Sequence, residues 1–205
     1  MNYILASQSP RRRELLAKLG ISFEIEPAIG EEVPCGETPQ EIVQGLAAAK
    51  AKEIAASHTG MPDPVVIGAD TVVVCDGEIL GKPKDRQDMA EMIRRLQGRA
   101  HEVYTGVALC YEKEGKPCCH SFFECTKVHF YPMSEKQITS YAEHSDGMDK
   151  AGGYGIQSDA AIYIRGIEGD YNNVVGLPIA RLYHELAALK LIEADLGVAI
   201  SAIFR

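Results

Sequence analysis

The sequence PVVIGADTVVV at residues 64–74 is apolar and rich in valine, a pattern typical of a strand buried in a sheet. Gly68, Ala69 and Asp70 interrupt the apolar run. A carboxylate in such a strand needs a partner or a metal ion, and a glycine beside it permits close approach of another backbone. Asp70 is thus either a functional acid or a strand-end residue that caps a turn, and the long apolar runs on both sides favour the functional acid.

Helices and strands alternate in the early part of the chain, and paired strands follow in the middle. Ser9 and Pro10 suit the N-cap and first residue of a helix that follows a strand over residues 2–6, and Thr38 begins a second helix with a capping box. The other predicted helices begin near Asp85, Ser134 and Pro178, and the other predicted strands cover residues 101–111, 118–131 and 160–165. Early alternation followed by paired strands predicts an α/β fold with a mixed central sheet and flanking helices.

The length and the charge of the chain restrict its organisation and its partners. Its 205 residues suit one large domain or two lobes that share a core, and no linker divides the chain. We expect a single domain over residues 1–192, with residues 193–205 as an apolar tail of unassigned structure. The net charge of -8 argues against binding to a nucleic-acid polymer, but a local basic cluster can still bind a small anionic substrate.

The cysteines and the hydropathy predict a cytoplasmic protein. Six cysteines occur without a C-x-x-C pair, which favours reduced thiols over a disulfide framework. We expect no signal segment at the N-terminus, and no apolar stretch reaches the ~18 residues of a membrane span. A membrane partner is therefore not expected.

The segment SQSPRRR at residues 7–13 predicts an anion-binding site. A strand leads into the N-terminus of a helix, where backbone N–H groups and the macrodipole attract anions. Three arginines lie in the first helical turn, although the dipole favours acidic residues there. A bound polyphosphate resolves this conflict, because guanidinium groups bind phosphate oxygens through paired hydrogen bonds. The alternative is a capped helix with a solvated basic face.

Other charged residues are candidates for the same site. Lys50 lies on the apolar stripe of the second predicted helix, where it either extends along the surface to solvent or points into a polar cleft. Lys82 lies between a glycine and a proline in a rigid loop. Glu31 and Glu32 precede the second helix, and they form either a solvated acidic loop or, together with Asp70, oxygen ligands for Mg²⁺.

A glycine-rich stretch, DKAGGYGIQ at residues 149–157, sets an aromatic ring and the amide of Gln157 beside a flexible backbone. We expect residues 151–155 to form a loop. Such a loop either closes on a nucleotide base or is an ordinary turn.

Six segments in this order resemble the Maf family of nucleotide pyrophosphatases, and the likeness covers nearly all of residues 1–192. They are ASQSPRRRELL at 6–16, GADTVV at 68–73, GKP at 81–83, HEVYTGV at 101–107, DKAGGYGIQ at 149–157 and VVGLP at 174–178. Each motif is weak singly, but the ordered set is specific. Gln8 departs from the family, where glycine, alanine or threonine is commoner.

The resemblance implies an α/β fold similar to that of the inosine triphosphate pyrophosphatases, with a cleft between two lobes. It also implies hydrolysis of nucleoside triphosphates to the monophosphate and pyrophosphate with a divalent metal ion, Mg²⁺ or Mn²⁺. One branch of the family acts on dTTP and UTP, and another acts on 7-methyl-GTP. Arg11, Thr71 and Gln157 match the pyrimidine branch, so the resemblance implies that these residues recognise the base.

The expected mechanism is attack of water on the α-phosphorus, with pyrophosphate as the leaving group. Asp70 and one of Glu31 or Glu32 are expected to hold the metal ion, and Asp70 is also the candidate general base. The residues expected to bind the triphosphate are Ser9, Arg12, Lys50 and Lys82.

Two alternatives stay open. One is a non-catalytic nucleotide sensor that regulates septum formation and cell-division arrest, and the other is a house-cleaning pyrophosphatase for purine nucleotides or 7-methyl-GTP. The presence of Asp70, Lys50 and Lys82 together favours an enzyme over a sensor. A homodimer is compatible with the sequence.

Overall fold

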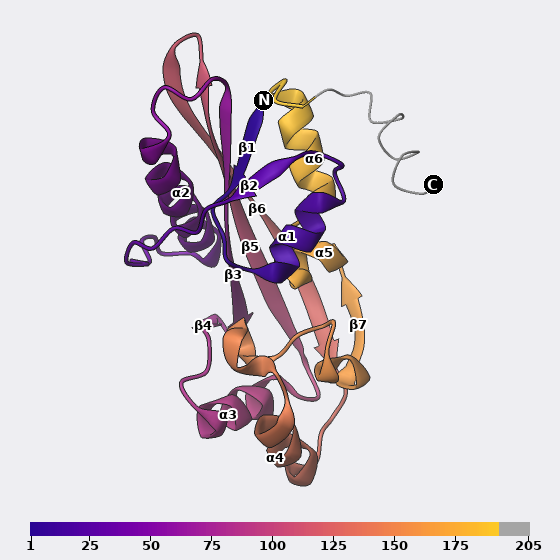
Figure 1. Cartoon of the computed structure of the whole chain (residues 1–205). Coiled ribbons are helices and arrows are strands. Elements are labelled where there is room, and N and C mark those ends of the chain that lie inside the picture. The colour runs from indigo at the N-terminus through magenta and orange to yellow at the C-terminus, as the bar shows by residue number, and fades with distance from the viewer. Residues whose placement is uncertain (193–205) are drawn as a thin grey trace. The chain divides into compact units, whose positions relative to one another are not determined.

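The computed structural model describes residues 1–192, so the tail predicted at residues 193–205 lies outside the described residues. A seven-stranded sheet has the strand order β2-β1-β3-β5-β6-β7, and β4 pairs with β3 (Figure 1). The strands are β1 (Asn2–Leu5), β2 (Phe23–Ile25), β3 (Pro64–Cys75), β4 (Glu78–Leu80), β5 (Ala100–Lys113), β6 (Lys116–Phe130) and β7 (Ile164–Glu168). β1 runs parallel to β2 and β3, whereas β4 and β7 pair antiparallel with β3 and β6, so the predicted mixed sheet is confirmed.

The predicted helix starts at Ser9, Thr38 and Ser134 are confirmed by their caps. The α-helices of the described residues are α1 (Pro10–Ala17), α2 (Pro39–Ser57), α3 (Arg86–Leu96), α4 (Glu135–His144), α5 (Tyr171–Val175) and α6 (Ile179–Ala188). Ser9, Thr38 and Ser134 each accept a hydrogen bond from a backbone N–H of the first helical turn. These side chains satisfy N–H groups that have no partner inside the helix, which is why the sequence marks the starts so clearly.

Two regions differ from the prediction. β3 is continuous, so Asp70 lies inside the strand and not in a break of it. The predicted strand at residues 160–165 is wrong, because a 3-10 helix, η3 (Asp159–Tyr163), precedes β7 there. A short apolar run does not distinguish helix from strand, and pairing of β7 with β6 determines where the strand begins.

The glycine-rich segment also contains more regular secondary structure than predicted. Its loop at residues 151–155 contains a turn of 3-10 helix, η2 (Ala151–Gly153), which follows another short helix, η1 (Gly147–Asp149). Gly152 adopts a φ of 69°, a conformation that favours glycine over residues with a side chain.

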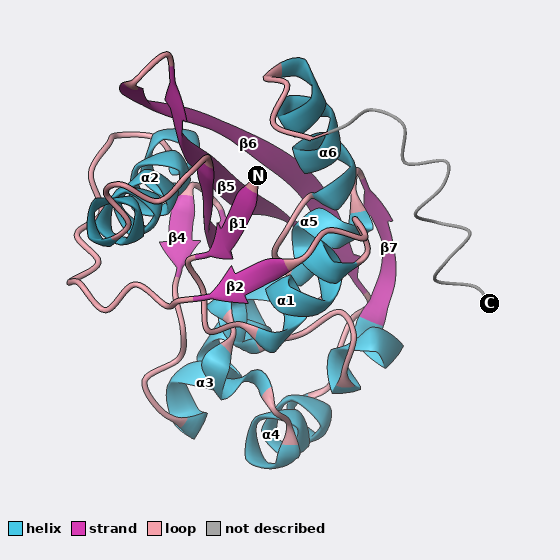
Figure 2. Ribbon diagram, turned by 45° about the horizontal axis from the view of Figure 1, so that its top comes forward, coloured by secondary structure: helices cyan, strands magenta, loops and turns pink. Residues whose placement is uncertain are grey.

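The chain divides into two compact units. Of the described residues, the first contains 1–70, 106–123 and 176–192. In this unit α2 covers one face of the sheet, and α1 and α6 cover the other (Figures 1 and 2). The α2 face is buried as one cluster of Ile4, Ala6, Ala47, Ala51, Ile54, Val66, Ala108 and Cys110.

The second unit contains residues 71–105 and 124–175. Its helices α3 and α4 pack against each other. Its core includes Val73, Met89, Ile93, Leu96, Val103, Phe130, Ile138, Tyr141 and Tyr154. Within residues 1–192, every helix is too short or too polar to span a bilayer.

Candidate functional site

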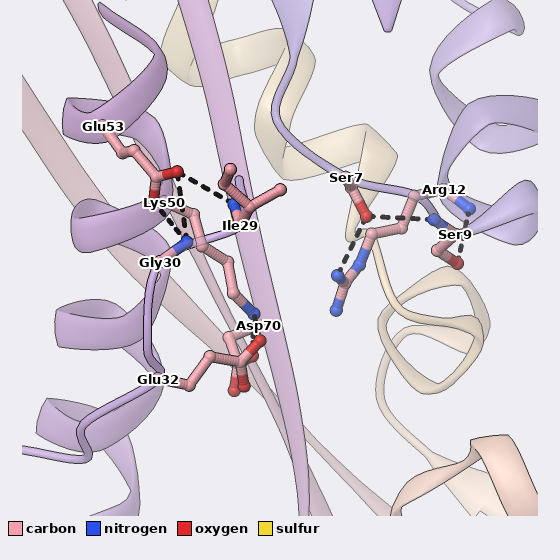
Figure 3. Close-up of polar contacts among 9 residues, drawn as sticks. All are labelled: Ser7, Ser9, Arg12, Ile29, Gly30, Glu32, Lys50, Glu53 and Asp70. Atoms are coloured by element: carbon pink, nitrogen blue, oxygen red, sulfur yellow. Dashed lines mark hydrogen bonds and ion pairs between the residues drawn. The ribbon is translucent and has the colours of Figure 1, made fainter. Parts of the chain in front are cut away.

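Asp70 of β3 is buried and pairs with Lys50 of α2 in the first unit. Lys50 Nζ lies 2.6 Å from Asp70 Oδ1 and 2.9 Å from Glu32 Oε1, so one ammonium group bridges two carboxylates (Figure 3). The side chains of Lys50 and Asp70 are 15% and 12% exposed, which keeps most water from their contact. Lys50 therefore points into a polar cluster and does not extend along the surface to solvent.

Two glycines allow α2 to pack close to the sheet. A Cβ at Gly68 would lie 2.2 Å from the carbonyl oxygen of Ala47, and a Cβ at Gly106 would lie 2.3 Å from the α2 backbone. Because no side chain fits at these separations, close packing of α2 requires glycine at both places. This packing brings Lys50 within reach of Asp70, which follows Gly68 by two residues on the same face of the strand.

A second charged residue of α2, Glu53, holds the loop that carries Glu32. The Glu53 carboxylate accepts hydrogen bonds from the backbone N–H of Ile29 at 2.8 Å and of Gly30 at 3.1 Å (Figure 3). Glu53 follows Lys50 by three residues, a spacing that puts both side chains on one side of the helix. One helix thus positions the ammonium group directly and Glu32 through the loop.

The N-terminus of α1 carries the half-buried Arg12, whose guanidinium group is fixed by hydrogen bonds. Its Nε donates to the carbonyl of Gly176 at 2.9 Å, and its Nη1 donates to Ser7 Oγ at 3.3 Å. Ser7 Oγ also accepts from the backbone N–H of Ser9 at 3.2 Å. Ser9 Oγ accepts from the backbone N–H of Arg12 at 3.4 Å and so caps the helix. The segment predicted to bind an anion is therefore internally cross-linked.

Arg12 interacts electrostatically with the acidic cluster. Burial lowers the pKa of the Arg12 guanidinium, the negative charge of Asp70 raises it, Arg11 lowers it and Glu32 raises it. An arginine remains charged despite such shifts. Arg12 and Lys50 thus bring two cationic groups to the surroundings of Asp70, an arrangement suited to a polyphosphate.

The acidic side chains that could hold a metal ion are Asp70 and Glu32, which the structure brings together on Lys50. Glu31 is exposed and takes no part in this contact. Among residues 1–192, no group of three or more histidine, cysteine or acidic side chains converges as a protein-only metal site requires. Two carboxylates nevertheless fit Mg²⁺, which typically takes one or two of them and completes its shell with phosphate and water.

In the second unit, Thr71 belongs to a chain of hydrogen bonds. Its Oγ1 lies 2.9 Å from Thr105 Oγ1, which donates to the carbonyl of Asn173 at 3.0 Å, so Thr71 is the donor to Thr105. The fully buried Asn173 donates through its amide to the carbonyl of Val103 at 3.0 Å and to Thr126 Oγ1 at 2.9 Å. These bonds attach α5 to β5 and β6.

Lys82 and Gln157 are exposed residues in two loops of the same unit. Lys82 lies between Gly81 and the buried Pro83, and the carbonyl of Gly81 accepts a hydrogen bond from the N–H of Gly152 at 2.9 Å. The loop that carries Lys82 is therefore joined to the glycine-rich segment that carries Gln157.

Tyr154 anchors the glycine-rich segment in the core of the second unit. Its hydroxyl lies 2.6 Å from Nε2 of the buried His101, and both rings meet Phe130 edge to face. Burial lowers the pKa of His101 to about 4, so this ring is neutral at neutral pH. His101 therefore acts as an uncharged hydrogen-bonding partner.

Ser7 and Glu53 are two residues of the site that the sequence did not predict. Ser7 lies two residues before the predicted N-cap, and only the fold brings Arg12 Nη1 to its hydroxyl. A signal for Glu53 was available, because it follows Lys50 at helical spacing. No sequence pattern indicates its contact with the backbone of the distant loop at Ile29 and Gly30.

The sequence comparisons with known proteins agree with the resemblance. A family model described as Maf-like protein matches residues 2–189. A protein of Agathobacter rectalis named dTTP/UTP pyrophosphatase is 49% identical over 197 residues, which cover 91% of this chain and 96% of that protein. A protein of Carboxydothermus hydrogenoformans with the same name is 46% identical over 186 residues, which cover 91% and 97%. A solved Mycobacterium abscessus structure, described as a nucleoside-triphosphatase and dITP/XTP pyrophosphatase, matches with a TM-score of 0.40 and 20% identity, covering 65% of this chain and 76% of that chain.

Proposed function

The chain belongs to the Maf-like protein family, and on this premise we propose that it hydrolyses dTTP and UTP to the monophosphate and pyrophosphate. The observation that carries this proposal is the bridge of Lys50 between Asp70 and Glu32, with Arg12 in electrostatic contact. Fixed cationic groups beside two carboxylates match a triphosphate that brings a divalent cation with it. The choice of dTTP and UTP as substrates follows the names of the two bacterial relatives.

The cationic residues bind and orient the triphosphate in this proposal. Arg12 has a preformed position at the α1 N-terminus, where the helix dipole also favours negative charge. Lys50 exchanges part of its contact with the carboxylates for a phosphate oxygen. Ser9 caps the N-terminus of α1. Lys82, which is exposed, adds a further positive charge. Stabilisation of charge on the phosphate oxygens is the main task in phosphoryl transfer.

Asp70 accepts the proton of the attacking water. Its burial beside Lys50 holds the carboxylate in one place, as a general base must be positioned. Asp70 and Glu32 would hold Mg²⁺ or Mn²⁺, and Glu31 is the alternative second ligand. When bound, the ion lowers the pKa of a coordinated water and neutralises phosphate charge.

Recognition of the base is assigned to Arg11, Thr71 and Gln157. A hydroxyl and an amide offer the donors and acceptors that pair with the carbonyl and imide groups of uracil and thymine. Their assignment rests on the family resemblance, because these three positions match its pyrimidine branch.

A nucleotide panel tests the proposal. Purified protein with Mg²⁺ is given dTTP, UTP, 7-methyl-GTP and dITP, and pyrophosphate and monophosphate are quantified. We expect the highest kcat/KM with dTTP and UTP. Faster hydrolysis of 7-methyl-GTP or dITP contradicts the assigned base, and tight binding without pyrophosphate release indicates a sensor. The cytoplasmic location, the homodimer and the link to cell division stay predictions.

A further inference from the structure

Two cysteines face each other across the hairpin of β5 and β6, outside the charged cluster. The Sγ atoms of Cys110 and Cys119 lie 2.9 Å apart. Cys110 is buried under α2 as part of the apolar cluster of that face, and Cys119 is exposed. A small reagent can therefore reach the thiol of Cys119, whereas the thiol of Cys110 is in contact with Cys119.

The backbone independently sets these two residues in register. β5 ends at Lys113 and β6 begins at Lys116, and the residues between them, Glu114 and Gly115, have φ values of 54° and 72°. Two successive positive φ values indicate a two-residue type I′ turn, which makes Lys113 and Lys116 the first hydrogen-bonded pair. Hydrogen-bonded and non-hydrogen-bonded pairs then alternate along an antiparallel hairpin.

Counting outward by three pairs puts Cys110 opposite Cys119 in a non-hydrogen-bonded pair. The Cα atoms of such a pair are about 4.5 Å apart, the closer of the two spacings. Disulfides span Cα separations of about 4.4 to 6.8 Å, so the hairpin accepts the bond without displacing a strand.

We infer that Cys110 and Cys119 are a modification site at which a low-molecular-weight disulfide oxidises the pair to a reversible cross-strand disulfide. The thiolate of exposed Cys119 attacks one sulfur of the small disulfide and expels one thiolate, which gives a mixed disulfide. The thiolate of Cys110, after losing its proton to solvent, attacks Cys119 Sγ and expels the second thiolate. Two protein thiols are oxidised, and the small disulfide is reduced to two thiols.

The two cysteines have distinct roles in this exchange. Burial raises the pKa of the Cys110 thiol, and the contact with Cys119 raises it further, so Cys110 is poorly suited to start the reaction. Its short distance to Cys119 compensates in the second step, because that attack is intramolecular.

Cys118 is the matched control that the chain provides. It precedes Cys119 in the same strand, so its side chain points to the opposite face of the hairpin. Its thiol lies 3.7 Å from the carbonyl oxygen of Lys116. A reagent that oxidises by exposure alone reacts with Cys118 as well, whereas formation of an internal bond depends on Cys110.

The test uses the full-length protein, treated with hydroxyethyl disulfide, freed of reagent, alkylated after unfolding and weighed by mass spectrometry. We expect Cys110 and Cys119 to be protected from alkylation, and the peptides that carry them to be joined and together two hydrogen atoms lighter than the two reduced peptides. Trypsin cuts after Lys113, so the two cysteines fall on separate peptides that only the disulfide joins. Dithiothreitol should separate them again. Cys118→Ser should leave the linked peptides unchanged, and Cys110→Ser should stop at the mixed disulfide.

Two results would overturn the inference. One is a wild-type product that carries the reagent on Cys119 and gains mass as Cys110→Ser does. The other is a linked peptide pair that disappears in Cys118→Ser and persists in Cys119→Ser. Circular dichroism of each variant before oxidation shows that the protein is folded, so that neither result arises from global unfolding.

Discussion

The two units of the chain use their polar side chains differently. In the first unit, Lys50 joins Asp70 to Glu32, and the Glu32 side chain is 60% exposed, so a ligand has access to the pair. In the second unit, His101 and Asn173 are buried and bond to groups of the core itself. The first arrangement holds charges that a substrate can engage, whereas the second joins strands and helices. Substitutions in the charged cluster of the first unit should therefore mainly lower turnover, whereas substitutions of the buried polar groups of the second unit should mainly lower stability.

The largest effect is expected from Asp70→Asn. The amide keeps the shape of the side chain but removes the negative charge and the proton acceptor. We expect kcat for UTP to fall by roughly 10²- to 10⁴-fold, the range typical of a general base, while nucleotide binding persists. Pyrophosphate release and isothermal titration calorimetry measure the two properties.

Asp76→Asn is the matched control for that substitution. Asp76 directly follows the same strand and makes an exposed ion pair with Arg99. Exposed pairs contribute little to stability, so this variant should keep its rate. If Asp70→Asn kept near-parental turnover, Asp70 would not take part in the reaction. The proposed functional difference between the two units would then also be wrong.

Gly68→Ala should affect both properties, because it acts on the packing that creates the charged cluster. The added Cβ would lie 2.2 Å from the Ala47 carbonyl oxygen, so α2 must move outward and carry Lys50 away from Asp70. We expect a loss of about 3 kcal/mol in unfolding free energy, near the upper end for overpacking, and a lower kcat in the protein that remains folded. Urea unfolding and pyrophosphate release give the two values.

Gly166→Ala is its control. A Cβ there meets no atom within 4 Å, so the same change of residue should alter stability little. Equal unfolding curves for the two variants would show that α2 does not need Gly68.

Protonation of a buried histidine in the second unit should lower the free energy of unfolding in acid. Burial lowers the pKa of His101 to about 4, below the ordinary value of 6.5. Between these pH values the unfolded chain binds a proton that the folded chain does not, so stability from this residue is present above about pH 6.5 and is lost as the pH falls toward 4. The loss has an upper limit of about 3 kcal/mol. Urea unfolding from pH 7 to pH 4.5 should show a shallower decline in His101→Asn.

His144→Asn controls for the loss of a histidine as such. His144 is exposed at the end of α4, so removal of its ring should leave the decline in acid unchanged. If His101→Asn declines as steeply as the parent, other groups cause the acid sensitivity.

Local rules predicted much of the fold. The caps at Ser9, Thr38 and Ser134 and the buried strand at residues 64–74 depend on a few neighbouring residues, and the structure confirms them. β2 was missed because it has three residues with little burial and exists through its pairing with β1. Such a strand carries no pattern of its own.

The candidate site was predictable in composition but not in arrangement. Lys50 and Asp70 stood out because each places a charge in an apolar element. Their 2.6 Å contact depends on the absence of side chains at Gly68 and Gly106, and the second of these lies far away in the sequence. Long-range packing of this kind leaves no periodicity for sequence analysis to detect.

The smallest effect is expected from Glu53→Gln, which tests whether the loop of Glu32 is positioned by α2. The variant keeps the shape of Glu53 but weakens its hydrogen bonds to the N–H groups of Ile29 and Gly30, which are stronger when the acceptor is charged. A loss of about 1 kcal/mol in loop positioning corresponds to roughly a fivefold rise in the Mg²⁺ concentration for half-maximal activity. At saturating Mg²⁺, kcat should return to the parental value. Glu143→Gln, an exposed change on α4, should leave the Mg²⁺ requirement unaltered. A fall in kcat that Mg²⁺ does not restore would show that Glu53 supports the fold of α2 and not the position of Glu32, and the charged cluster would then depend on Lys50 alone for its arrangement.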